Sequence, residues 1–157
     1  DLCQAALALG RAAGYRGVGT VEFLVELDAT GQETGRWVFL EANPRLQVEH
    51  PVTEEVYGLD LVQAQLRLAA GATLAELGLY DPALVAPRGF AMELRVNAES
   101  FTVDGTSAPA PGVLDAFDLP GGAGVRVETA CYRGYEVRGG YDPLLAKLIV
   151  HTPARGR

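Results

Sequence analysis

The feature that most constrains this chain is a pair of strand-like runs separated by a polar turn. Residues 21–27 (VEFLVEL) and 36–41 (RWVFLE) are rich in β-branched and aromatic side chains, whereas residues 28–35 between them are polar and include two glycines. Such a pattern predicts a β-hairpin. One face of the hairpin carries apolar residues that we expect in the core: Val21, Phe23, Val25, Val38 and Leu40.

Helices are expected on both sides of this hairpin. Residues 2–13 are rich in Ala and Leu, and residues 59–70 carry apolar side chains at three- and four-residue steps, which favours an amphipathic helix. A short helix is expected over 73–77, which opens with the spacing of a capping box. Pro44 and Pro51 are expected to interrupt regular structure between the hairpin and the second helix.

From residue 89 onward, short strand-like runs alternate with Gly and Pro. Extended or mixed segments are expected at five places: 90–98, 113–117, 125–129, 136–138 and 145–151. Residues 80–88 hold two prolines and little pattern, so we expect a boundary there between domains at 1–87 and 88–157. The fold class expected from these elements is α+β.

Composition excludes several classes of partner. The chain has 20 acidic and 13 basic residues and a formal net charge of -7, which disfavours nucleic acid and anionic membranes. No apolar run reaches the roughly 18 residues of a membrane span. Cys3 and Cys131 form neither a disulfide framework nor a CxxC pattern, so a cytoplasmic setting is expected. The chain begins without Met, and we expect it to be a piece of a longer protein.

The hairpin carries two acidic residues that are expected to face each other. If the turn is centred at residues 31–32, Glu22 lies opposite Glu41 and Leu24 lies opposite Phe39. Directly opposed Cβ atoms are about 4.5–5.5 Å apart, so the two carboxylates would repel. A divalent cation such as Mg²⁺ would relieve this repulsion. The alternative is a solvated sheet edge, and a one-residue slip would place the carboxylates on opposite faces.

Polar side chains occupy alternate positions after the second strand: Glu41, Asn43, Arg45, Gln47 and Glu49. In extended chain, alternate residues share one face, so these groups would line one wall of a cleft. Glu41 and Asn43 would offer oxygens to a metal. Arg45 would bind an anion through its two-pronged guanidinium, and Glu49 would be available as a base.

The segment 41–54 (EANPRLQVEHPVTE) resembles the signature of biotin carboxylases and related ATP-grasp enzymes. That signature reads roughly E-x-N-x-R-(I/L)-Q-V-E-H-x-V-T-E. Residues 17–24 (GVGTVEFL) are similar to the strand that precedes it in the family. Residues 93–99 (ELRVNAE) and 141–148 (YDPLLAKL) resemble landmarks of the family's C-terminal domain. The resemblance is collinear over almost the whole chain.

This resemblance implies the C-terminal lobe of an ATP-grasp fold with an antiparallel sheet over 1–87, followed by a small α+β biotin carboxylase C-terminal domain over 88–157. It implies ATP- and bicarbonate-dependent carboxylation of biotin within an acyl-CoA type carboxylase. The implied cofactors are ATP, Mg²⁺ or Mn²⁺, and biotin on a carrier domain. The implied partners are bicarbonate, that carrier domain, a carboxyltransferase component and further copies in a homo-oligomer.

The resemblance also implies a metal site for ATP. Glu22, Glu41 and Asn43 would hold the divalent metal that bridges the phosphates. The sequence departs from the common family pattern at Ala42, where Met or Val is frequent, and at Pro44, where Thr or Ser is frequent. These departures leave the chemistry in place and put the subfamily in doubt.

The remaining site residues implied by the resemblance handle bicarbonate and biotin. Arg45, Gln47 and the backbone of Val48 would bind bicarbonate, and Glu49 would deprotonate it. Arg95 would contact the ureido oxygen of biotin and stabilise its enolate. Two alternatives remain: Glu49 as a structural acid paired with Arg45, and Arg95 as a strand residue directed into solvent.

Other functions compete with this interpretation. One is a different bicarbonate-activating ATP-grasp ligase, such as a carbamoyl-phosphate synthetase. Another is a non-catalytic structural or regulatory copy. The phosphate-covering lid of an ATP-grasp enzyme is expected upstream of residue 1, so we expect the isolated chain to fold without being active.

Overall fold

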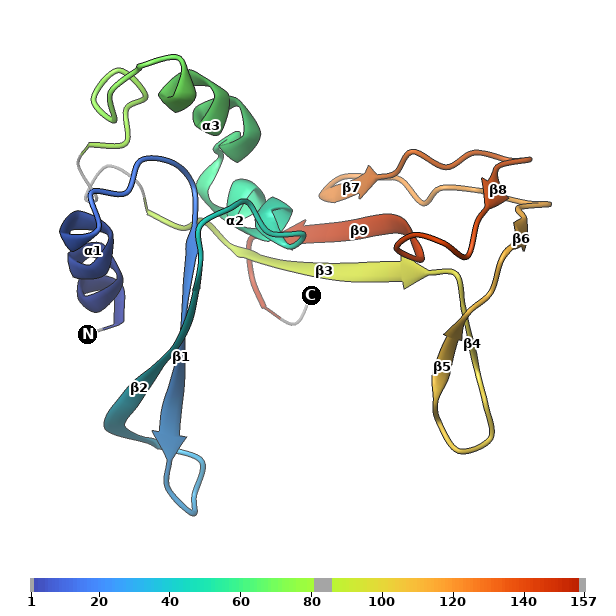
Figure 1. Cartoon of the computed structure of the whole chain (residues 1–157), viewed down its shortest axis with the longest axis horizontal. Coiled ribbons are helices and arrows are strands. Elements are labelled where there is room, and N and C mark those ends of the chain that lie inside the picture. The colour runs from blue at the N-terminus through green and yellow to red at the C-terminus, as the bar shows by residue number, and fades with distance from the viewer. Residues whose placement is uncertain (1, 81–85, 156–157) are drawn as a thin grey trace. The chain divides into compact units, whose positions relative to one another are not determined.

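Figure 1 shows the chain as a computed structural model, which describes residues 2–80 and 86–155. The chain divides into two compact units. The first contains Asp1–His50 and Gly58–Ala86, and the second contains Pro51–Tyr57 and Pro87–Arg157. Within the boundary segment expected at 80–88, residues 81–85 lie outside the described residues.

The first unit holds the expected hairpin and two helices. Its elements are α1 (Leu2–Ala12), β1 (Thr20–Leu27), β2 (Glu33–Asn43) and α3 (Leu61–Ala69). Strands β1 and β2 pair in antiparallel fashion, and β2 is longer than the sequence pattern indicated. The hairpin and both longer helices are therefore confirmed.

The register of the hairpin is confirmed at its base and differs toward its turn. Glu22 pairs with Glu41 as expected, but Leu24 pairs with Val38 instead of Phe39. A β-bulge directly after Glu22 adds one residue to β2, which shifts every later pair. The carboxylate pair lies on the base side of the bulge, so the shift leaves it in place.

The expected core face of the hairpin is only partly covered. Val21, Phe23 and Val25 of β1 are half-buried, whereas Val38 is 59% and Leu40 50% exposed. In the described part of the chain, β2 packs extensively only against β1. The expectation that Val38 and Leu40 of β2 are buried is therefore wrong, because β1 is the only described element that makes extensive contact with that strand.

The short helix expected over 73–77 is a turn instead. The capping-box hydrogen bonds do form: Thr73 N donates to Glu76 Oε2 over 2.8 Å, and Glu76 N donates to Thr73 Oγ1 over 3.2 Å. Gly78 follows in the left-handed region at φ +70°, which ends the segment after a single turn.

Helix α2 (His50–Tyr57) is the element that the sequence interpretation missed. Pro51 was expected to interrupt regular structure, but proline is well suited to the first turn of a helix, where its missing N–H has no partner to lose. Pro51 is fully buried. A hydrogen bond from Arg88 N to Val56 O (2.6 Å) ties α2 to the second unit.

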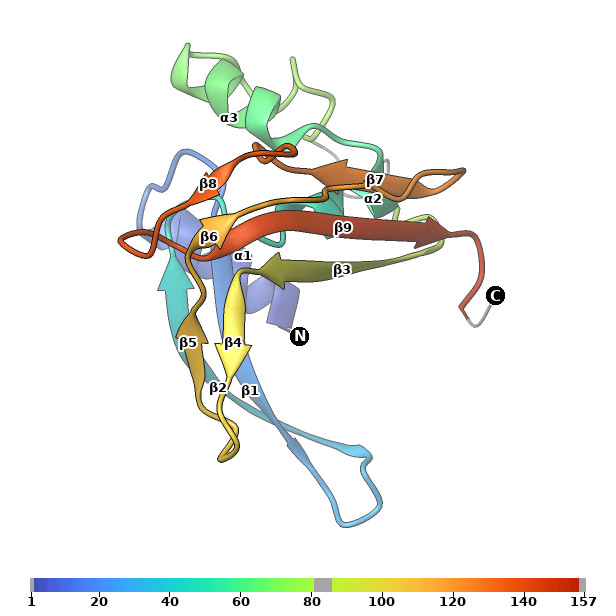
Figure 2. The ribbon, with the colours of Figure 1, turned by 90° about the vertical axis from the view of Figure 1, so that its right-hand side faces the viewer.

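The second unit is built on an antiparallel sheet of three strands in the order β3-β9-β7 (Figures 1 and 2). Its strands are β3 (Phe90–Asn97), β7 (Val125–Glu128) and β9 (Leu144–Thr152). Two small pairs accompany it: β4 (Glu99–Phe101) with β5 (Ser107–Pro109), and β6 (Gly112–Val113) with β8 (Glu136–Val137). The three sheet strands confirm the expected segments, β6 and β8 are shorter than expected, and the β4–β5 hairpin was not expected.

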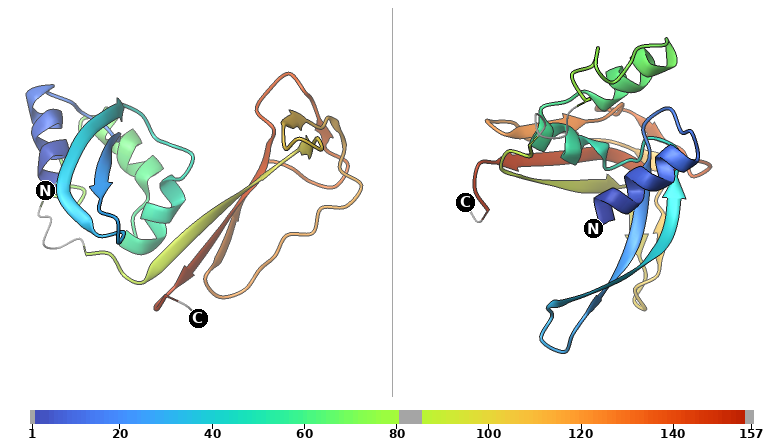
Figure 3. Two further views of the ribbon diagram at one scale, coloured as in Figure 1. Left: turned by 90° about the horizontal axis from the view of Figure 1, so that it is seen from below. Right: turned by 90° about the vertical axis from the view of Figure 1, so that its left-hand side faces the viewer.

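Strand β9 forms the centre of this unit and runs beside β3 along most of its length (Figure 3). Ile149 of β9 is fully buried. The backbone at Gly89 and at Gly124 lies close to the end of β9, and the φ values of these two glycines are +71° and +75°. A Cβ atom at Gly124 would lie 2.3 Å from the carbonyl oxygen of His151, so only glycine fits there.

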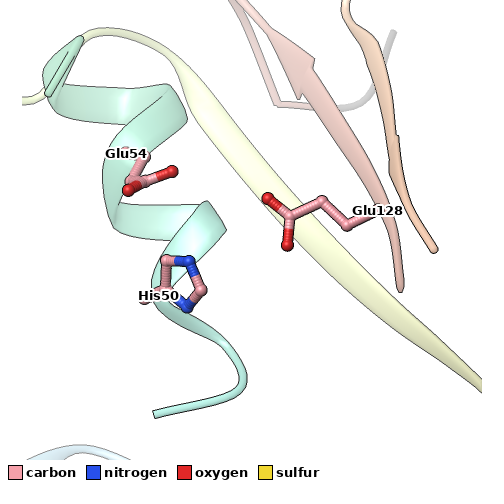
Figure 4. A group of neighbouring side chains, drawn as sticks. All are labelled: His50, Glu54 and Glu128. Atoms are coloured by element: carbon pink, nitrogen blue, oxygen red, sulfur yellow. The ribbon is translucent and has the colours of Figure 1, made fainter. Parts of the chain in front are cut away.

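A group of ion pairs joins α2 to the sheet, and we call it the Arg126 cluster: Arg126, Glu54, Glu55, Glu128 and Lys147. Arg126 of β7 donates to Glu54 over 2.8 Å and to Glu55 over 3.2 Å, and it also contacts Glu128. Lys147 Nζ lies 2.5 Å from Glu128 Oε2. Figure 4 shows the side chains of Glu54 and Glu128 directed toward each other.

In the Arg126 cluster, hydrogen bonds together change the pKa values of Arg126 and Glu128 more than burial does. Burial is the largest single influence on the pKa of Arg126 and lowers it, but hydrogen bonds to Glu54, Glu128 and Glu55 raise it above its ordinary value. Burial likewise raises the pKa of Glu128, and hydrogen bonds from Lys147 and Arg126 bring it below its ordinary value. Arg126 and Glu128 therefore stay charged near neutral pH.

No helix in the described ranges has the length and the apolar character that a membrane crossing requires.

We predict that the Arg126 cluster stabilises the second unit. Glu54 is only 6% exposed, so Arg126→Ala leaves a buried carboxylate without its guanidinium. We expect a loss of about 2 kcal/mol, below the roughly 3–5 kcal/mol of a fully buried pair because 35% of the Arg126 side chain is exposed. Urea unfolding followed by circular dichroism measures this loss.

The matched control is Arg138→Ala. Arg138 pairs with Glu136 over 3.2 Å, but both side chains are largely exposed. An exposed pair contributes less than about 1 kcal/mol. Equal losses for the two variants would contradict the stabilising role of the Arg126 cluster.

Candidate functional site

The base of the β1–β2 hairpin brings together the three residues expected to bind a metal. Glu22 and Glu41 are directly opposed across the two strands, and Asn43 ends β2. The Asn43 side-chain amide donates to Glu41 Oε1 over 2.7 Å and to Glu22 Oε1 over 3.3 Å. Glu22 and Asn43 are half-buried, and Glu41 is exposed.

Gln47 also lies at this carboxylate pair. Its Nε2 donates to Glu22 Oε1 over 3.4 Å, although residues 22 and 47 are far apart in the sequence. Two amide donors therefore partly offset the negative charge of the carboxylates. The resemblance assigned Gln47 to bicarbonate, and the structure places it beside a proposed metal ligand.

This arrangement fits a divalent cation. The oxygens of Glu22 and Glu41 converge on one donor, the Asn43 amide, and carboxylate and amide oxygens are the ligands that Mg²⁺ prefers. The amide orientation is set by hydrogen bonding, so a half-turn of the Asn43 side chain would present its oxygen instead.

The chain does not continue as an extended strand after Asn43. It bends at Arg45, turns at residues 48–49 and enters α2 at His50. The single extended wall expected over residues 41–49 is therefore wrong beyond Asn43. The physical reason is Pro44, which has no N–H to extend the β ladder.

Arg45 and Glu49 lie on the exposed part of this bent segment. Arg45 Nη1 donates to the carbonyl oxygen of Leu46 over 3.3 Å, and its backbone N–H donates to Asn43 O over 2.8 Å. Glu49 is exposed, and Val48 is 38% exposed. These groups are accessible to a small anion from solvent.

Arg95 lies on β3 of the second unit. Its side chain is 49% exposed, and its Nε lies 3.8 Å from Oε1 of Glu93, whose side chain is 5% exposed. Lys147 of β9 is directly opposite Arg95. Sequence reasoning missed Glu93, although the two-residue spacing of a strand already places it on the same face as Arg95.

Two family models match this chain, one over each half. A model described as "Carbamoyl-phosphate synthase L chain, ATP binding domain" matches residues 1–77. A model described as "Biotin carboxylase C-terminal domain" matches residues 93–157.

Individual proteins are similar to this chain over almost its whole length. A biotin carboxylase of Allochromatium vinosum is 46% identical over 155 residues, which is 99% of this chain and 31% of the relative. A single-chain, multi-domain long-chain acyl-CoA carboxylase has a TM-score of 0.87 and 46% identity, covering 96% of this chain and 16% of that protein.

A second similar structure was solved with ligands. It is the biotin carboxylase domain dimer of Hydrogenobacter thermophilus 2-oxoglutarate carboxylase in complex with MgADP, ADP and bicarbonate. It has a TM-score of 0.82 and 40% identity, covering 95% of this chain and 30% of that one. This chain thus spans about a third or less of the length of the proteins it matches.

Proposed function

Because this chain belongs to the biotin carboxylase family, we propose that the protein carrying it carboxylates biotin at the expense of ATP, with bicarbonate as the source of CO₂. The observation that carries this proposal is the match of both domains in order along one chain. The match over residues 93–157 favours the biotin reaction over that of a carbamoyl-phosphate synthetase, because the matching family model describes a biotin carboxylase C-terminal domain.

Glu22, Glu41 and Asn43 are the proposed ligands of Mg²⁺ or Mn²⁺. When bound, the metal supplies positive charge against the phosphates of ATP. Support comes from the convergence of the two carboxylates on Asn43 and from the MgADP complex of the related 2-oxoglutarate carboxylase domain. The role of Glu22 and Glu41 is to hold that charge beside the phosphates.

Arg45, Gln47 and the Val48 backbone N–H are proposed to hold bicarbonate, and Glu49 to remove its proton. The deprotonated oxygen then forms a bond to the γ-phosphorus of ATP as the bond to ADP breaks, which yields carboxyphosphate. Arg45 suits this task because its guanidinium donates two parallel hydrogen bonds to a planar oxyanion.

Arg95 is the proposed contact of the biotin ureido oxygen. Carboxyphosphate breaks down to CO₂ and phosphate, the released phosphate takes the proton of biotin N1, and N1 bonds to the carbon of CO₂. The ureido oxygen gains negative charge when N1 is deprotonated. A guanidinium placed at that oxygen stabilises this charge.

The wider setting is also proposed from the family. The ATP-grasp part extends over 1–87 and the biotin carboxylase C-terminal domain over 88–157. Biotin would arrive on a carrier domain and leave for a carboxyltransferase component that serves an acyl-CoA, and the whole protein would be a cytoplasmic homo-oligomer. The related 2-oxoglutarate carboxylase domain is a dimer, which supports the last point.

The metal proposal predicts the effect of Glu41→Gln in the full-length protein. The substitution keeps the shape of the side chain and removes one anionic ligand. We expect Mg²⁺-dependent ATP cleavage to fall about 10- to 100-fold. Glu26→Gln is the control, because Glu26 lies on the same hairpin and pairs with the exposed residues Arg36, at 3.5 Å, and Thr34, at 2.7 Å. Unchanged rate and Mg²⁺ dependence in Glu41→Gln would contradict the assignment.

A second prediction separates the roles of Glu49 and Arg95. Glu49→Gln should lower both bicarbonate-dependent ATP hydrolysis and biotin carboxylation, because bicarbonate must lose its proton first. Arg95→Ala should lower biotin carboxylation more than ATP hydrolysis, because it acts after carboxyphosphate forms. Both reactions are measured with free biotin, and equal effects of the two substitutions on both would refute this division.

A further inference from the structure

Glu93 is a buried acid on the face of β3 that carries Arg95. Only 5% of its side chain is exposed, and its Oε1 lies 3.8 Å from Arg95 Nε. Glu93 is directly opposite Ile149, which is fully buried and in turn opposite Arg126 on β7. The carboxylate therefore lies on the face that the Arg126 cluster joins to α2. A buried charge of this kind needs a nearby opposite charge.

The residues directly opposite Arg95 on the neighbouring strands explain why its positive charge needs a nearby carboxylate. Arg95 is directly opposite Lys147, which is directly opposite Glu128. Like charges in directly opposed positions destabilise a sheet. Glu128 lies 2.5 Å from Lys147 and offsets that charge. Glu93 likewise offsets the positive charge of Arg95.

We propose that Glu93 is a positioning residue that fixes the Arg95 guanidinium for biotin, an inference that rests on the proposed function of Arg95. Arg95 Nε lies at ion-pair distance from the buried carboxylate and beyond hydrogen-bond reach, so electrostatic attraction favours positions of the guanidinium beside Glu93. An arginine side chain samples many rotamers, and this freedom must be given up on binding. The attraction to Glu93 reduces that freedom before biotin arrives, while half of the Arg95 side chain stays accessible.

The test uses Glu93→Gln in the full-length protein with free biotin. We expect kcat/KM for biotin to fall about 10- to 100-fold, as for other losses of alignment at a reacting group. Bicarbonate-dependent ATP hydrolysis without biotin should fall much less. In an Arg95→Ala background, Glu93→Gln should change kcat/KM for biotin by less than about twofold, because the two substitutions remove one shared interaction.

Glu136→Gln is the matched control. Glu136 and Arg138 have the same two-residue spacing and form an ion pair of 3.2 Å, but both are exposed and belong to no proposed site. We expect this substitution to leave biotin kinetics unchanged. Glu93→Asp keeps the charge, and it should retain more activity than Glu93→Gln.

A second readout is independent of turnover. The ¹⁵N relaxation of Arg95 Nε, assigned by loss of its signal in Arg95→Lys, should report motion of larger amplitude in Glu93→Gln than in the unsubstituted protein. Glu93→Asp should show a smaller increase, which keeps the test valid if Glu93→Gln folds poorly.

The outcomes separate the two claims. Equal losses in both reactions, or full additivity with Arg95→Ala, would show that Glu93 only supports the fold and would overturn the positioning role. An Arg95→Ala variant with unchanged biotin kinetics would overturn the proposed function of Arg95, and the positioning role with it. A biotin-specific loss in Arg95→Ala without one in Glu93→Gln would overturn the role of Glu93 alone.

Discussion

The candidate metal site depends on one constraint, the direct pairing of Glu22 with Glu41 across the β1–β2 hairpin. Two opposed carboxylates repel, and the structure offsets this repulsion with donors from Asn43 and Gln47. The bulge lies on the turn side of Glu22, so irregular pairing near the tip does not disturb the base of the hairpin.

A second electrostatic network organises the C-terminal unit. Arg126 connects β7 to α2 through Glu54 and Glu55, and Glu128 connects it to Lys147 on β9. The first residue of α2 directly follows Glu49, the proposed base, in the sequence. The ion pairs of Arg126 thus connect the helix that follows the proposed bicarbonate residues to the sheet that carries the proposed biotin contact.

Patterns local in sequence predicted much of this structure. The hairpin at 20–43, helix α1 and the strands β3, β7 and β9 follow from runs of apolar residues bounded by turns. The failures have physical causes that a local pattern does not contain. Pro51 begins a helix because it lies in the first turn, and the bulge after Glu22 is a matter of pairing between strands. The carboxylate pair was predictable, whereas the partners of Arg126 depend on tertiary packing.

The central claim is that the opposed carboxylates at the base of the hairpin bind a divalent cation. Paramagnetic Mn²⁺ tests it directly, because it broadens the NMR signals of nearby groups even when it binds weakly. In the chain labelled with ¹⁵N at asparagine, the side-chain amide signal of Asn43 should broaden at low Mn²⁺, and that of Asn97, the other asparagine, should not. Glu41→Gln should abolish the difference. Equal broadening of both signals, or none at Asn43, would contradict the account.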